Sequence, residues 1–263
     1  MTQLPLDSPP PASDSERVCK LTVAYDGTGF HGFAAQRDQR TVEGELSSAL
    51  ARVLQTPVEL SCAGRTDAGV HAWGQVVSFR VPASWDDERI GQLPRKVNGQ
   101  VAPELVVRRA EVVADGFHAR RSASSRSYRY TVVNRDAPDP FRARTAWWVP
   151  VPLDLSLLRL GADPFLGEHD FASFCRSGPP GSSTVRRVLE SRWCEVDDGV
   201  LRYDITATAF CWQMVRSIVG TLVDVGSGRL TPGDVLGVLR ARDRTAAGRV
   251  APPEGLCLWS VAY

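Results

Sequence analysis

Apolar residues in the first half of the chain recur with two periods, which predicts both strands and helices. Alternation at every second residue predicts a strand at 18–25, with Leu21 and Val23 on one face. Helical spacing predicts a helix at 42–53 that Thr41 caps and that ends by Pro57. The other elements predicted here are strands at 58–63, 75–81, 105–113 and 126–133 and a helix at 86–98 that Pro94 interrupts.

The second half shows the same mixture of patterns. An Asp-Asp-Gly turn at 197–199 separates two alternating stretches, which is typical of a β-hairpin. Thr231 is suited to cap the helix that follows it. The predicted elements are strands at 145–149, 185–196, 201–210 and 256–263 and helices at 154–165, 212–225 and 231–240.

The order of these elements predicts the fold class. Strands and helices alternate irregularly, and the neighbouring strands 126–133 and 145–149 favour antiparallel pairing over a doubly wound parallel sheet. We therefore predict an α+β fold of two similar α/β lobes with a largely antiparallel sheet. The lobes are predicted at 17–135 and 141–263, with a boundary in the Asp- and Pro-rich stretch 136–140 and a disordered tail at 1–16.

Composition narrows the class of protein. With 43% hydrophobic and 23% charged residues, the chain lies in the ordinary globular range. It has neither a signal-peptide pattern nor an apolar run of the about 18 residues that a membrane span needs, so we expect a cytoplasmic protein. Six cysteines without a C-x-x-C pair and four scattered histidines indicate free thiols and no metal site. Without a G-x-G-x-x-G or P-loop pattern, we expect no cofactor.

The formal net charge of +1 conceals a basic segment. Residues 106–144 contain nine arginines and four acidic residues. Basic side chains on one surface neutralise phosphates, but a solvated face without a partner has the same composition. Nucleic-acid binding and a solvated face both remain open on charge alone. The arginines that we assign to RNA contact are Arg120, Arg121 and Arg126.

A glycine-bounded loop carries the first candidates for catalysis. The stretch 64–72 reads GRTDAGVHA, so Arg65 and Asp67 are two residues apart directly after a predicted strand. The glycines permit a planar ligand to approach the backbone, and Arg65 is predicted to hold Asp67 ionised and oriented. An Arg-x-Asp pair alone is also a common surface ion pair, worth about 0–1 kcal/mol.

Two further segments contain residues suited to a nucleic-acid site. In the strand 126–133, Tyr128 and Tyr130 share a face. Such pairs are most often packing residues, but beside a carboxylate loop one of the two rings is a candidate stacking platform for a base. In the helix 212–225, Arg216 lies among apolar side chains. Its guanidinium must either extend to water or meet an anion, and the pattern leaves both open.

Taken together, these segments resemble the tRNA pseudouridine synthase A family. The loop GRTDAGVHA is closely similar to that family's catalytic loop, RSYRY at 126–130 to its Arg-x-Tyr-x-Tyr motif, and FCWQMVRSIVG at 210–220 to its F-x-x-x-M-V-R-x-I-x-G motif. Weaker similarities are YDGTGF at 25–30 and HDFASF at 169–174. The resemblance spans roughly Leu21 to Tyr263.

The resemblance implies a fold, a reaction and a set of residue roles. It implies the pseudouridine synthase fold with a central cleft, Asp67 as the essential catalytic residue and Arg216 as its ion-pair partner. Tyr128 would contact the target base, which leaves Tyr130 as a core residue, and Leu256 would lie beneath the base. The resemblance also implies a homodimer that acts without a cofactor on uridines 38, 39 and 40 of the tRNA anticodon stem-loop.

Pseudouridine formation breaks the N1–C1′ bond of uridine, turns the base and joins C5 to C1′, so no electron is lost and no redox chemistry is needed. Such a reaction needs one carboxylate. Asp67 would either attack C1′ or remove a ribose proton, and the sequence leaves both routes open. One alternative function is a non-catalytic RNA-binding module or tRNA folding helper. Another is a glycoside hydrolase, which ordinarily uses two acidic groups, whereas Asp67 alone stands out here.

Overall fold

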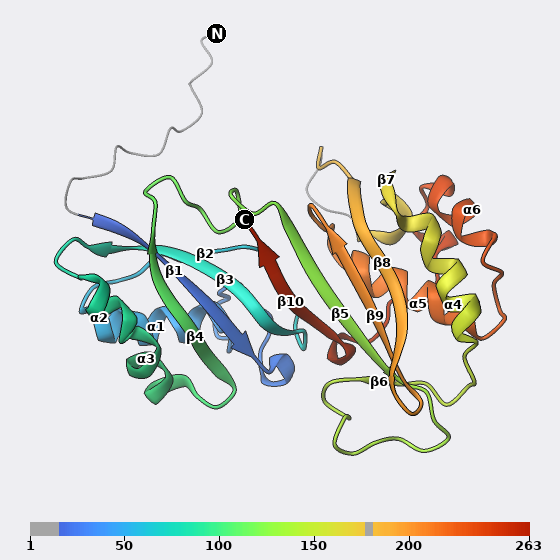
Figure 1. Cartoon of the computed structure of the whole chain (residues 1–263), viewed down its shortest axis with the longest axis horizontal. Helices are drawn as coiled ribbons and strands as arrows, with labels where there is room; N and C mark the ends of the chain where they lie inside the picture. The colour runs from blue at the N-terminus through green and yellow to red at the C-terminus, as the bar shows by residue number, and fades with distance from the viewer. Residues whose placement is uncertain (1–15, 177–180) are drawn as a thin grey trace, which may run out of the picture.

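Strands and helices alternate along the computed structural model, which describes residues 16–176 and 181–263 (Figure 1). Apart from Glu16, the predicted tail at 1–16 lies outside the described residues. The first half contains the strands β1 (Glu16–Tyr25), β2 (Ser61–Cys62), β3 (His71–Pro82), β4 (Leu105–Val113) and β5 (Ser125–Val133) and the helices α1 (Val42–Leu54), α2 (Asp87–Gly91) and α3 (Leu93–Val101). The second half contains the strands β6 (Trp147–Trp148), β7 (Gly167–Asp170), β8 (Val185–Asp197), β9 (Val200–Ala207) and β10 (Leu256–Ala262) and the helices α4 (Leu155–Ala162), α5 (Met214–Gly226) and α6 (Asp234–Ala241).

Two helix starts show how local sequence sets the elements. The Thr41 side-chain oxygen accepts a hydrogen bond from the backbone N–H of Gly44 at 3.2 Å and so caps α1 as predicted. Pro94 lies in the first turn of α3, where its missing N–H breaks no helical hydrogen bond. The interruption predicted at Pro94 is therefore confirmed as a boundary between the two short helices α2 and α3.

The ten strands of the described residues belong to one sheet. Its order is β4-β1-β3-β10-β5-β9-β8-β7, with β2 beside β3 and β6 beside β5. Strand pairs in this sheet are antiparallel except β3–β10 and β5–β6. The predicted α+β class with a largely antiparallel sheet is confirmed. The edge strand β7, which includes the first residues of the HDFASF segment, was not predicted.

The predicted antiparallel pairing of 126–133 with 145–149 is wrong. Trp147 and Trp148 lie beside Val132 and Val133 and run parallel to β5. The physical reason is the connection at 134–146, which is long enough to return the chain to the end of β5 in the same direction, as a parallel pair requires. Asn134 then fixes the returning segment, because its Nδ2 donates to the Val149 carbonyl at 2.7 Å.

The last strand joins the two halves of the molecule. β10 lies between β3 and β5, parallel to the first and antiparallel to the second. β5 precedes the stretch 136–140 proposed as a domain boundary, and it pairs with β9 of the second half. The helices gather in two groups, with α1, α2 and α3 at one end of the sheet and α4, α5 and α6 at the other (Figure 1). The seam between the halves therefore runs along β3, β10 and β5.

A stack of side chains crosses this seam. Trp73 and Trp259 stack with 5.9 Å between ring centres, and the guanidinium groups of Arg108 and Arg129 lie over their rings at 3.9 and 3.6 Å. Arg129 follows Tyr128 in β5, so the stack lies on the opposite face of the sheet from Tyr128. The stack thus links β4, β3, β10 and β5.

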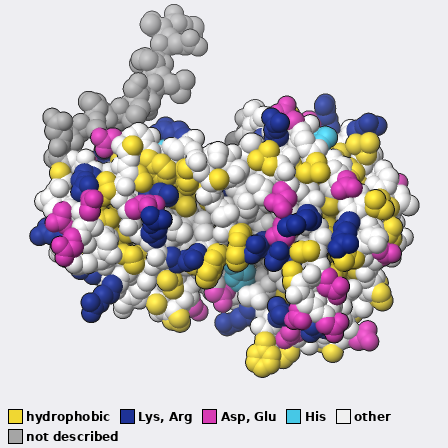
Figure 2. All heavy atoms as spheres, viewed as in Figure 1, with side chains coloured by type: hydrophobic (Ala, Val, Ile, Leu, Met, Phe, Trp, Pro, Cys, Tyr) yellow, Lys and Arg dark blue, Asp and Glu magenta, His cyan; other side chains and the backbone are white. Residues whose placement is uncertain are grey.

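Elsewhere on the face shown in Figure 2, acidic and basic side chains are interspersed rather than segregated.

Candidate active site

The loop between β2 and β3 has its backbone fixed from two sides. The backbone carbonyl of the buried residue Thr66 accepts a hydrogen bond from the backbone N–H of Phe33 at 3.0 Å. The Thr66 hydroxyl shares a hydrogen bond with the hydroxyl of Tyr25 at 2.8 Å. At Gly32, whose φ is +91°, a Cβ would lie 2.9 Å from the Thr66 carbonyl oxygen. Only glycine permits that approach, so main-chain contacts set the position of the residue after Thr66.

That next residue is Asp67, whose carboxylate receives two hydrogen bonds from the α5 region. Arg216 Nη1 donates to Oδ2 at 3.3 Å, and Trp212 Nε1 donates to Oδ1 at 3.0 Å. The Asp67 side chain is 26% exposed, so the carboxylate is held and still reachable. The structure thus brings together Asp67 and Arg216, which the sequence analysis placed in one ion pair.

Arg216 is fixed independently of the carboxylate. Its Nε donates to the Ala251 carbonyl at 2.7 Å, and the Ala251 N–H donates to the Arg216 carbonyl at 3.0 Å. The close approach of α5 requires Gly220, because a Cβ there would lie 1.7 Å from the Arg249 carbonyl oxygen. The Arg216 side chain is only 13% exposed, so it meets an anion instead of extending to water.

Arg65 does not hold Asp67, which corrects the predicted clamp of two guanidinium groups. Within 16–176 and 181–263, Arg65 is exposed and forms no ion pair. A turn begins at Asp67, whose carbonyl accepts the Val70 N–H at 3.1 Å, and the Asp67 carboxylate is bonded to Arg216 and Trp212 instead. The Arg65 charge acts on Cys62 instead: burial raises the pKa of that thiol to about 11, and Arg65 opposes the rise.

Trp212 is the site residue that the sequence analysis missed. It lies four positions before Arg216, and its side chain is 48% exposed. The family motif leaves this position unspecified, so the resemblance gave no reason to single it out. The available signal was an aromatic N–H donor just before the helix that carries the predicted partner of Asp67.

Tyr128 lies on β5, near enough to Asp67 for that charge to act on its hydroxyl. It is 9% exposed, and its ring packs edge-on against Phe210 with 5.0 Å between ring centres. Burial raises the pKa of the Tyr128 hydroxyl, and the negative charge of Asp67 raises it further. The neighbouring Tyr130 is fully buried and donates its hydroxyl to the Pro252 carbonyl at 2.8 Å, which confirms it as a core residue.

Leu256 is the first residue of β10 and is also buried, at 6% exposure. It lies opposite Tyr130, whereas Leu258 lies opposite Tyr128. The residues just before Leu256 touch the loop of Asp67, since a Cβ at Gly69 would lie 2.9 Å from the Pro253 side chain. The structure therefore places the Leu256 segment against the candidate site.

Arg126 is a structural residue, which corrects its assignment to RNA contact. It is 9% exposed, and its guanidinium donates to backbone carbonyls on several segments. The acceptors include Ala63 at 3.0 Å, Arg120 at 2.7 Å and Thr208 at 2.8 Å. Burial lowers the pKa of this guanidinium. Arg126 thus ties the base of the Asp67 loop to the segment that follows β9, and its donors are used inside the protein.

We expect Arg126→Ala to lower the free energy of unfolding by about 3 kcal/mol, because buried carbonyls lose a charged donor. Urea denaturation measures the effect. Arg121→Ala is the matched control, since Arg121 is exposed, and its change is expected to stay within about 0.5 kcal/mol. Equal stability of the two variants would contradict the structural role of Arg126.

Arg120 and Arg121 remain candidates for RNA contact. Both are exposed, and neither forms an ion pair with any residue that the structure describes. Their backbone N–H groups donate to His118 Nδ1 at 3.1 and 3.4 Å, which fixes the turn that presents them. Much of the basic segment is engaged with carboxylates inside the chain, namely Arg109, Arg129, Arg135, Arg142 and Arg144.

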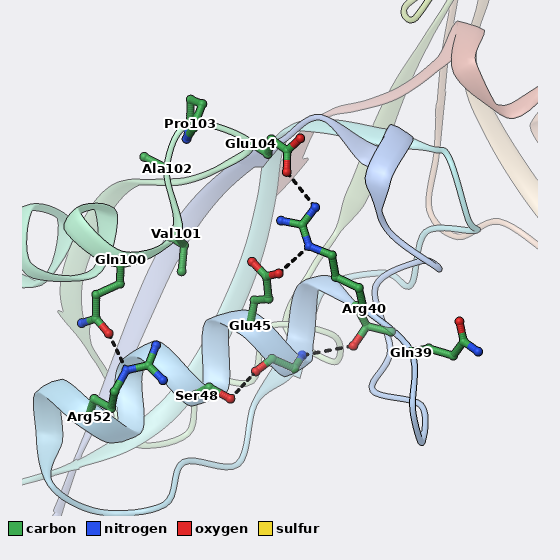
Figure 3. Close-up of a pocket in the computed structure, with 12 residues that line it drawn as sticks. Gln39, Arg40, Glu45, Ser48, Arg52, Gln100, Val101, Ala102, Pro103 and Glu104 are labelled. Atoms are coloured by element: carbon green, nitrogen blue, oxygen red, sulfur yellow. Dashed lines mark hydrogen bonds and ion pairs between the residues drawn. The ribbon is translucent and has the colours of Figure 1, made fainter.

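A separate cavity of about 640 Å³ lies between α1 and the α3–β4 connection (Figure 3). Arg40 projects into it and pairs there with Glu45 and Glu104, and Arg52 donates to Gln100. Its cationic groups are therefore already partnered, and Asp67 is not among its lining residues.

The described residues contain neither a candidate metal cluster nor a helix suited to span a membrane. Across the described ranges, no cluster of three or more His, Cys, Asp or Glu side chains is arranged to hold a metal ion. The helices of this part of the chain are too short or too polar to cross a membrane.

The arrangement defines a class of site: one reachable carboxylate, held by donors from the far half of the chain, beside a buried tyrosine. Comparison with known proteins gives its family. A family model described as "tRNA pseudouridine synthase" matches residues 21–120 and 162–263, which include Asp67 and Arg216. A tRNA pseudouridine synthase A of Bacillus velezensis is 43% identical over 246 residues, covering 93% of this chain and 98% of the relative.

Further relatives with the same name come from other bacteria. The protein of Leifsonia xyli subsp. xyli is 41% identical over 269 residues, covering 95% of this chain and 93% of the relative. The protein of Pseudothermotoga lettingae is 39% identical over 241 residues, covering 92% of this chain and 97% of the relative. The chain belongs to the tRNA pseudouridine synthase A family, and it is an isomerase that forms pseudouridine.

Proposed function

We propose that this enzyme isomerises uridines 38, 39 and 40 of the tRNA anticodon stem-loop, with Asp67 as its single catalytic carboxylate. The observation that carries the proposal is the Asp67 carboxylate itself, fixed by Arg216 and Trp212 and still partly exposed. Family membership supports tRNA as the substrate. The three positions rest on the resemblance of the motifs.

Asp67 acts on the ribose of the target nucleotide. In one route its oxygen bonds to C1′ as the N1–C1′ bond breaks, and in the other it removes a ribose proton as a glycal forms. In both, the base turns and C5 bonds to C1′: in the first route the Asp67–C1′ bond breaks as this bond forms, and in the second the ribose proton returns to the sugar. The C5 proton is then lost to solvent and N1 gains a proton, so the product is an isomer of uridine. The Arg216 charge stabilises the ionised carboxylate that either route requires.

The target uridine must leave the RNA stack to reach Asp67, which costs a few kcal/mol. Tyr128 is suited to receive the base, because its ring is fixed against Phe210 and its hydroxyl has no hydrogen-bond partner among the described residues. Leu256 contributes an apolar surface from the start of β10. Exposed Arg65 lies on the same loop as Asp67, where it is available to a phosphate.

We expect the double variant Arg120→Ala/Arg121→Ala to bind tRNA more weakly and with a salt dependence reduced by about two phosphate contacts. Both guanidinium groups are exposed and free of ion pairs with described residues, so each would release counterions on binding. Fluorescence anisotropy over a salt series measures the slope. Arg229→Ala, which removes an exposed arginine paired with Asp224, is the control. An unchanged slope in the double variant would rule out this contact surface.

The proposal includes a homodimer working in the cytoplasm. Family membership supports both, since the resemblance implies a dimer and tRNA is the substrate. Analytical ultracentrifugation of the full chain tests the dimer, and a monomer at working concentrations would remove that part of the proposal.

Tritium release from C5-labelled uridine tests the reaction directly. Anticodon stem-loops with a single labelled uridine at position 38, 39 or 40 would each release tritium with the enzyme and yield pseudouridine in a digest. Tight binding without release from any of them would favour the non-catalytic RNA-binding module. Release only from uridines outside the anticodon stem-loop would overturn the assigned positions.

A further inference from the structure

The two oxygens of the Asp67 carboxylate have different partners. Arg216 donates to Oδ2, and Trp212 Nε1 donates to Oδ1 at 3.0 Å. The torsion that turns an aspartate carboxylate about its Cβ–Cγ bond is broad, so one hydrogen bond leaves it free to swing. Donors on both oxygens fix the plane of the carboxylate. The indole is therefore the group that completes its orientation.

The Trp212 ring is itself held in place. The backbone carbonyl of Trp212 accepts a hydrogen bond from the backbone N–H of Arg176 at 3.0 Å, and the Arg176 guanidinium lies 4.4 Å from the centre of the indole ring. The following residue, Gln213, has a φ of +61° and turns the chain into α5. Because of that turn, Trp212 and Arg216 approach the same carboxylate from neighbouring positions.

We propose that Trp212 is a positioning residue for the isomerisation, acting through the Asp67 carboxylate; the inference rests on the proposed function. An indole N–H only donates, so it does not exchange protons with the carboxylate. The indole is also uncharged, so it leaves the net charge of the Asp67–Arg216 ion pair unchanged. The indole thus turns one carboxylate oxygen toward the ribose without competing for the chemistry.

The test replaces the indole by rings with and without a donor. Trp212→Phe keeps an aromatic ring and removes the N–H, and we expect the single-turnover rate to fall about tenfold with KM unchanged within about twofold. Trp212→His keeps a ring N–H and is expected to recover part of that loss. Trp148→Phe is the matched control, because it removes an indole hydrogen bond of 2.9 Å to the Arg135 carbonyl from a tryptophan of similar exposure.

The outcomes separate this inference from the function on which it rests. A Trp212→Phe enzyme with the wild-type rate overturns the positioning role while the proposed function stands. A raised KM with an unchanged rate also overturns it, because Trp212 would then contact the RNA rather than act through Asp67. Equal losses in the Phe and His variants show that ring volume matters and not the N–H, which again overturns it. A wild-type protein that releases no tritium removes both.

Discussion

Replacement of Asp67 by Ala or Asn is expected to reduce isomerisation by at least about 1,000-fold, while tRNA affinity stays within a few-fold. The reason is that both routes use the ionised carboxylate, and the structure shows no second carboxylate bonded to Arg216 or Trp212 among the described residues. Affinity is preserved because contacts to phosphates come from other side chains. Asp67→Asn is the sharper variant, since it keeps the shape and removes the charge.

Tritium release under single-turnover conditions measures the rate, and anisotropy measures tRNA binding. Asp38→Asn is the control, because that side chain is 88% exposed and, among the residues that the structure describes, pairs only with Arg37. The control is expected to match the wild type in both measurements. If Asp67→Asn released tritium at the wild-type rate, the single-carboxylate mechanism would be abandoned.

The second large effect is expected at Arg216. Arg216→Ala removes the donor to Asp67 and the donor to the Ala251 carbonyl, so we expect the rate to fall about 100-fold and the free energy of unfolding to fall by about 3 kcal/mol. Arg216→Lys keeps the positive charge but lacks the rigid fork that serves both acceptors. It should keep more stability than Arg216→Ala while remaining slow.

Single-turnover rates and urea denaturation of the two variants separate charge from geometry. A lysine variant as fast as the wild type would show that charge alone suffices at this position. An alanine variant that retains the wild-type rate would mean that the contact between Arg216 and Asp67 has no part in the reaction.

Local patterns determined most of the secondary structure. The cap at Thr41, the break at Pro94 and the hairpin at 197–199 depend on a few neighbouring residues, and each formed as predicted. The strand predicted at 105–113 has the same bounds as β4. The direction of β6 was wrong because it depends on the path of a long connection, which no local pattern encodes.

The candidate site also combines features that local sequence predicts with features that only the folded chain sets. The sequence by itself identified Asp67 and Arg216 through motifs, and it could not distinguish Arg216, which meets a carboxylate, from Arg126, which is saturated by carbonyls. Both positions hold an arginine that is largely buried, and only the groups around each guanidinium in the folded chain separate the two roles. The Trp212 contact with Asp67, between residues 145 positions apart, came from the tertiary structure alone. The physical reason is that β10 joins the two halves in one sheet, and that pairing decides which distant donors reach the carboxylate.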